Sequence, residues 1–236
     1  MDSLLALTAA VAATLFSLDL WRDYLRRPRP HIAAYGTGIT MFALATWALF
    51  IGLSMGWSGP TYRSFFLFGA VLNIPFLALG SMFLVVGRRA GHVMTMALGA
   101  LTAISTTLAT TVPFQGPLPR DGIPHDMFAT GFGPRLFAII GGATGTTILV
   151  ILAMASLVRF WKRDRNIVWA NAMIVAGTFA AAWGGTGLAL GEAGGFAVSL
   201  MLAICLIWAG YRVASGPAPG LEGISAGRDP RSSSDS

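Results

Sequence analysis

Charged residues are scarce in this sequence. They make up 11% of its 236 residues, whereas a soluble domain carries about 25%. The only cysteine is Cys205, so the chain can form neither an intramolecular disulfide nor a cysteine-based metal motif. This composition leaves little charge for a soluble domain and indicates a chain that lies mainly in a membrane.

Seven long uncharged stretches take up most of the chain instead. Each can hold a helix of about 16–25 apolar residues, roughly the length needed to cross a 30 Å hydrocarbon core. The sequence therefore predicts an all-α, polytopic membrane protein with one domain, residues 1–213, that is a seven-transmembrane-helix bundle. The helices are expected near residues 3–21, 32–54, 64–86, 92–112, 135–158, 167–190 and 193–211. Residues 214–236 are low in hydrophobic residues, which predicts a disordered cytoplasmic tail.

The basic residues are distributed unevenly between the loops. One side of the predicted membrane, which includes the tail, holds 13 Lys and Arg residues, and the other side holds three. Because cytoplasmic loops collect Lys and Arg, the N-terminus is expected outside and the C-terminus in the cytoplasm. The expected partner of these side chains is anionic lipid at the cytoplasmic face, and not nucleic acid. The expected location is a bacterial plasma membrane, and the high ratio of Arg to Lys fits a high-GC source.

The sequence shows no convergent set of catalytic or cofactor-binding residues. Microbial rhodopsins also have seven helices, but they need a lysine in the last helix, and the only lysine here, Lys162, lies in a predicted loop. Residues 52–56 match G-x-S-x-G, yet they fall at a membrane helix end, and only His125 lies on the same side as Ser54. The outer-loop pattern D-x-x-x-H-D that ends at Asp126 is weakly specific for a metal. We therefore predict no enzymatic activity, no cofactor and no metal site.

Two features predict a polar cavity within the bundle. In the third helix, Pro75 cannot donate a backbone hydrogen bond, which predicts a kink, and Asn73 is available to satisfy the freed groups. In the fourth helix, several threonines fall on one face. The candidate cavity residues are Asn73, Pro75, Thr102, Thr106 and Thr110. The alternative is that the kink only shapes the bundle and that the threonines bond their own helix backbone.

Ionisable residues are absent from the expected mid-membrane region, where ion-coupled transporters usually carry them. The charges near the expected outer helix ends are Arg63, Arg135 and Glu192. They can form an outward-facing polar vestibule, or they can be interfacial charges that are satisfied locally. Near the inner end of the first helix, Asp19 has Arg22 one turn away as its expected partner.

The fifth and sixth helices carry small residues on one face. These are Gly141 and Gly145 in the fifth helix, and Gly177, Ala181 and Gly184 in the sixth. Small residues at this spacing let helix backbones approach closely. The faces can serve packing within the bundle, or they can bind a membrane-protein partner or a second copy of the chain.

Two stretches carry a resemblance to known sequences. The first is YRSFFLFGAVLNIP at 62–75, continuing to Gly80, and the second is PRLFAII at 134–140, followed by the glycines of the fifth helix. They resemble a group of uncharacterised seven-helix bacterial membrane proteins that is typical of high-GC bacteria. The resemblance covers most of the third to seventh helices and implies the same architecture, and it implies no particular activity.

Two functional hypotheses follow. The first is a non-enzymatic membrane protein that acts with a membrane partner, as an accessory subunit or a small sensor. It depends on the glycine-rich faces and on the near-absence of buried charge. The second is a carrier or receptor for a small, weakly polar solute or lipid. Its site would be the Asn73–Pro75 kink and the threonine face, reached from outside past Arg63 and Glu192.

Overall fold

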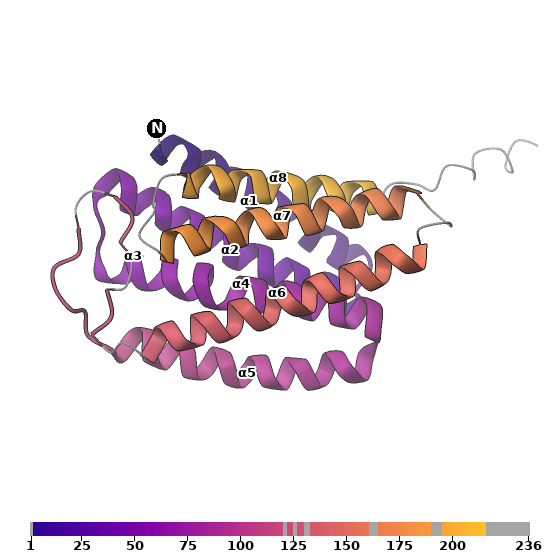
Figure 1. Cartoon of the computed structure of the whole chain (residues 1–236), viewed down its shortest axis with the longest axis horizontal. Coiled ribbons are helices and arrows are strands. Elements are labelled where there is room, and N and C mark those ends of the chain that lie inside the picture. The colour runs from indigo at the N-terminus through magenta and orange to yellow at the C-terminus, as the bar shows by residue number, and fades with distance from the viewer. Residues whose placement is uncertain are drawn as a thin grey trace, which may run out of the picture.

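The computed structural model describes residues 2–119, 122–124, 127–129, 133–160, 165–189 and 195–215. Within this part of the chain the elements are helical, apart from an isolated antiparallel bridge between Phe114 and Phe128. The elements are α1 (Asp2–Arg26), α2 (Pro30–Met55), α3 (Gly59–Ser64), η1 (Phe65–Leu72), α4 (Asn73–Ser81), η2 (Met82–Val86), α5 (Arg88–Thr111), α6 (Gly133–Phe160), α7 (Arg165–Ala189) and α8 (Phe196–Ser215). The long helices lie side by side and run roughly along one direction (Figure 1).

The helices have the length and composition of membrane spans. Six helical segments of the described residues are long and apolar enough to cross a membrane, and the run from Gly59 to Val86 counts as one of them. Their outward surfaces carry large apolar side chains, such as Met55, which is 86% exposed, and Met96, which is 75% exposed. Exposed apolar surface of this kind suits a lipid environment. The prediction of an all-α chain with several helices long and apolar enough to cross a membrane is confirmed for the described residues.

The third helical segment begins earlier than the sequence predicts. Its first element, α3, starts at Gly59 rather than near residue 64 because Ser58 caps it. The Ser58 side chain accepts a hydrogen bond from the backbone N–H of Thr61 at 3.3 Å. A proline in the first turn favours the same start, since that turn does not need its missing N–H. Only residues 56–58 therefore separate α2 from the next helix.

The N-terminal helix forms much of the core with short side chains. Four of its alanines, Ala6, Ala9, Ala10 and Ala13, are fully buried. Alanine lets neighbouring backbones approach closely, and α1 packs against both α2 and α8. The first and last helices of the described chain are therefore neighbours in the bundle (Figure 1).

The middle of the third segment is not a regular α-helix. Two π-helical elements, η1 and η2, flank α4, which contains Pro75. Pro75 has no N–H to donate to the carbonyl of Val71, and the N–H of Asn73 bonds the carbonyl of Phe68, five residues earlier. The irregularity that the sequence predicts at Asn73–Pro75 thus takes the form of wide turns, which occur frequently at functional sites.

Candidate ligand cavity

A small cavity lies where five helices meet. It has a volume of about 20 Å³ and is lined by residues of α2, α4, α6, α7 and α8. Asn73, Ile74 and Leu77 contribute from α4, Thr178 and Ala181 from α7, and apolar side chains from the other three helices. The cavity therefore lies directly beside the irregular third segment, with an amide and a hydroxyl as its polar groups.

The amide of Asn73 is buried and only partly bonded. The residue is 6% exposed, and its Oδ1 accepts a hydrogen bond from the backbone N–H of Ile74 at 2.6 Å. Its Nδ2 has no hydrogen-bond partner among the described residues. Thr178 is 5% exposed and donates its hydroxyl hydrogen to the carbonyl of Ile174 at 2.8 Å. Asn73 and Thr178 are thus the two polar residues in a lining that is otherwise apolar.

Two glycines of α6 allow this geometry. A Cβ on Gly141 would lie 2.8 Å from the backbone oxygen of Val71, and one on Gly145 would lie 3.0 Å from the backbone nitrogen of Pro75. Because neither glycine has a side chain, α6 packs directly onto the turn that Pro75 distorts. The two glycines therefore belong to the packing around the cavity.

The remaining small residues predicted as an interface also pack within the bundle. A Cβ on Gly177 would lie 2.9 Å from the backbone oxygen of Ala203, and one on Gly184 would meet the side chain of Ser199. Both contacts join α7 to α8, and Ala181, between them, lines the cavity. The contacts of these residues are with neighbouring helices of the same chain.

The threonines of α5 lie elsewhere. Thr102 and Thr110 donate their hydroxyl hydrogens to carbonyls one turn back in their own helix, and neither these residues nor Thr106 line the cavity. Pro75 is buried beside the cavity without lining it. The structure therefore brings Asn73 together with Thr178 rather than with the α5 threonines. Thr178 lies in α7, where the sequence pattern indicated only a face of small residues.

The end of the bundle that the sequence predicts to be the outer one is built around Arg63. Its guanidinium donates to the backbone oxygens of Ala109 and Val112, the second at 2.9 Å, and so caps the C-terminal end of α5. The same group lies 4.5 Å from the ring centroid of Phe114. Arg63 therefore interacts with the end of α5 and the loop that follows it. Of the other two predicted vestibule residues, Arg135 lies in the first turn of α6, and Glu192 is outside the described residues.

The loop after α5 folds back over this end. Its two arms are joined by backbone hydrogen bonds from Gln115 to Met127 at 2.8 Å and from Ala129 to Pro113 at 2.9 Å. The Nε1 of Trp57 donates a hydrogen bond to the carbonyl of Gly122 at 2.8 Å. The rings of Phe114 and Phe128, one in each arm, pack against each other and against Tyr62 and Phe66. We call this layer the outer cap. Asp121, His125 and Asp126, the metal pattern of the sequence, lie outside the described residues.

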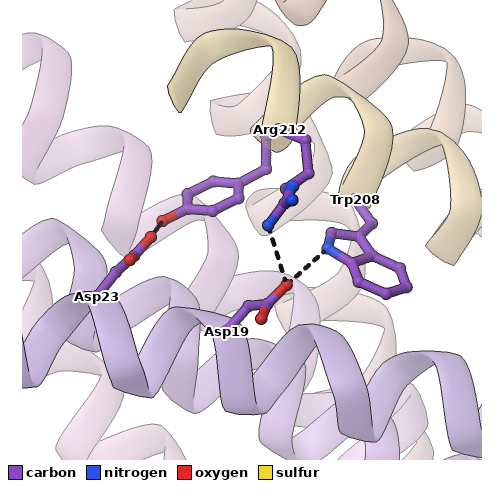
Figure 2. A network of polar contacts seen from close by, with 5 residues as sticks. Asp19, Asp23, Trp208 and Arg212 are labelled. Carbon is purple, nitrogen blue, oxygen red and sulfur yellow. Dashed lines mark hydrogen bonds and ion pairs between the residues drawn. The ribbon is translucent and has the colours of Figure 1, made fainter. Parts of the chain in front are cut away.

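At the opposite end of the bundle, polar contacts join α1 to α8 (Figure 2). Asp19 Oδ2 lies 3.6 Å from the guanidinium of Arg212 and accepts a hydrogen bond from Trp208 Nε1 at 3.3 Å. One turn further, the hydroxyl of Tyr211 donates to Asp23 Oδ2 at 2.6 Å. We call this set the α1–α8 clasp. Asp19 therefore pairs with Arg212 of the last helix, and the expected pair with Arg22 is not formed.

Removing the Tyr211 hydroxyl should measurably weaken the clasp. Tyr211→Phe deletes a hydrogen bond to a carboxylate and is expected to lower the free energy of unfolding by about 1–2 kcal/mol. Tyr24→Phe is the control, because that ring contacts Trp21 and its hydroxyl makes no hydrogen bond among the described residues. Denaturant unfolding of both variants in one detergent measures the difference. An equal loss in the two variants would contradict a specific role of the Tyr211–Asp23 bond.

Comparisons with known proteins identify no relative. No protein-family model matches the chain, and no curated protein and no solved structure matches it. A functional conclusion for this chain therefore depends on the geometry of the cavity and of the two ends of the bundle.

Proposed function

We propose that this chain is a seven-helix protein of a bacterial plasma membrane, and that it acts as a carrier or receptor for a small, weakly polar solute or lipid. The observation that supports this function best is the cavity beside Pro75. It combines a buried amide with free donors, a hydroxyl and apolar walls. Ligand sites are usually of this composition, mostly apolar with a few polar groups that fix orientation.

The proposed topology places the N-terminus outside and the C-terminus in the cytoplasm. It takes α7, with 25 residues, as a span beside the six segments that are long and apolar enough by composition. In this orientation the α1–α8 clasp and the basic residues that follow α1 face the cytoplasm. Anionic lipid headgroups are their expected partners there. The outer cap faces the exterior.

A ligand larger than a few atoms needs a wider cavity than the present 20 Å³. The third segment is the place where the bundle can widen, because Pro75 removes one backbone hydrogen bond and the flanking π-helical elements have non-α turns. Movement of α4 away from α6 at Gly141 and Gly145 would enlarge the cavity. We therefore propose the third segment as the hinge of the carrier or receptor.

Native mass spectrometry of the protein extracted with its own lipids tests this function. The wild-type chain is expected to retain a defined small molecule, and Asn73→Leu is expected to lose it while remaining inserted and folded. Thr102→Val is the matched control, since that residue lies on α5 away from the cavity. If all three proteins retain the small molecule equally, the cavity is not its binding site.

The accessory-subunit hypothesis is a second candidate, and α5 is the surface that favours it. Only Gly91, Leu98, Ser105 and Ala109 of this helix are buried. A Cβ on Gly99 would meet nothing within 4 Å, so a partner helix could approach this face closely. The same extract decides between the candidates. A stoichiometric second protein that is lost in Gly99→Leu would support an accessory subunit or small sensor, and a second copy of the chain would indicate a homo-oligomer.

A further inference from the structure

Asn73 offers a guest in the cavity the two N–H donors of its amide nitrogen. Its Oδ1 already accepts from the backbone N–H of Ile74 at 2.6 Å, and this bond determines which way the amide is turned. Nδ2 then carries two N–H donors that have no partner among the described residues, in a side chain that is 6% exposed. A donor without a partner is costly inside a helix bundle, where bulk water cannot satisfy it.

Thr178 of α7, which lines the same cavity, offers the complementary group. Its hydroxyl hydrogen is donated to the carbonyl of Ile174, so the oxygen lone pairs are the part that remains for a guest. The residue is 5% exposed and lines the same cavity as Asn73. The volume of about 20 Å³ is above the minimum of roughly 10–15 Å³ that one water needs. The site therefore has room for one water-sized molecule, and Asn73 and Thr178 are the two polar residues among those that line it.

We infer that the cavity binds one water molecule, which accepts a hydrogen bond from Asn73 Nδ2 and donates one to Thr178 Oγ1. The water joins α4 to α7 beside Pro75, where α4 lacks a backbone hydrogen bond of its own. The other walls, including Ile74, Leu77 and Ile207, are apolar and leave the guest these two protein partners.

The water site is independent of any larger ligand. A ligand that displaces the water would place a hydroxyl or carbonyl oxygen at the same point, and this extension rests on the proposed function.

A double-mutant cycle on the full-length chain tests the bridge. Asn73→Leu and Thr178→Val keep nearly the same volume and remove one partner each. Each is expected to lower the midpoint of thermal unfolding by about 3 °C, and the double variant by about the same amount, because all three lose the same water. A rise in the midpoint of Asn73→Leu would overturn the inference, since it would mean that a dry, unsatisfied amide had been replaced by a better-packed side chain. Strict additivity of the two losses would overturn it as well.

Ser105→Ala is the reference for a polar group that has no bridge. The Ser105 Oγ is buried without a hydrogen-bond partner among the described residues, so its removal should leave the midpoint unchanged or raise it. A loss in Ser105→Ala as large as that in Thr178→Val would show that deleting any buried hydroxyl has this effect, and would overturn the assignment.

Nuclear magnetic resonance can detect the water directly, without a measurement of protein stability. In the wild-type chain, nuclear Overhauser transfer from water to the Asn73 side-chain amide protons is expected, and in Thr178→Val it should weaken several-fold. Absence of this transfer in the wild type overturns the water site. The result is distinguishable from failure of the proposed function, because a chain that retains no solute in native mass spectrometry can still show the transfer and the coupled cycle.

Discussion

Gly141→Leu is expected to prevent the bundle from folding correctly. A Cβ at this position would already lie 2.8 Å from the backbone oxygen of Val71, and the rest of a leucine side chain would meet Pro75. The neighbour is backbone and cannot rotate away, so α6 must move off the third segment. We expect a loss of about 3 kcal/mol or more in the free energy of unfolding. Thermal unfolding and size-exclusion chromatography in detergent measure it.

The adjacent residue supplies the control. A Cβ on Gly142 would meet nothing within 4 Å, so Gly142→Leu adds the same side chain to the same helix on an open face. It is expected to insert, fold and unfold much like the wild type. If the two variants lose stability equally, the packing of α6 onto the Pro75 turn is not what makes Gly141 necessary.

Arg63→Met should release the outer cap. The arginine donates to two carbonyls at the end of α5 and lies 4.5 Å from the ring centroid of Phe114. Methionine keeps an apolar chain but removes both hydrogen bonds and the charge over the ring, which together are expected to contribute about 2–4 kcal/mol. Hydrogen exchange should rise most at residues 112–119 and 127–129, and the free energy of unfolding should fall.

Two further variants show whether this effect is specific to Arg63. Arg63→Lys retains the charge, but a compact ammonium cannot reach both carbonyls in the planar geometry of a guanidinium, so an intermediate loss is expected. Arg89→Met removes an exposed arginine at the opposite end of α5 and should leave exchange in the loop unchanged. A loop that stays equally protected in Arg63→Met would show that its aromatic side chains suffice to hold it.

Much of the architecture could be predicted from where charges are missing. A membrane span has to be free of charge over about 20 residues, and that requirement is local, so it can be read along the chain. The irregular turn at Pro75 was predictable for the same reason, because a missing N–H affects the residues next to it in sequence. Features that depend on residues of a single helix could therefore be predicted without a structure.

Contacts between two helices could not be predicted from the sequence. The glycines of α6 were visible as a small face, but the sequence does not show that this face contacts Val71 and Pro75. The threonines of α5 had the spacing of a polar lining, yet the hydroxyl beside Asn73 comes from Thr178, more than 100 residues along the chain. Asp19 likewise pairs with a residue of the last helix instead of the one a turn away.

The α1–α8 clasp has a consequence for how this protein is made. Helices leave the ribosome in order, so α1 is in the membrane long before its partner in the clasp exists. Trp208 follows Asp19 by 189 residues, and until it is synthesised Asp19 and Asp23 have no contact with α8. A chain that stops before α8 would keep these acidic groups uncovered beside the bilayer. Synthesis of α8 therefore lets α1 complete its polar contacts, and the clasp forms only in a chain that contains both helices.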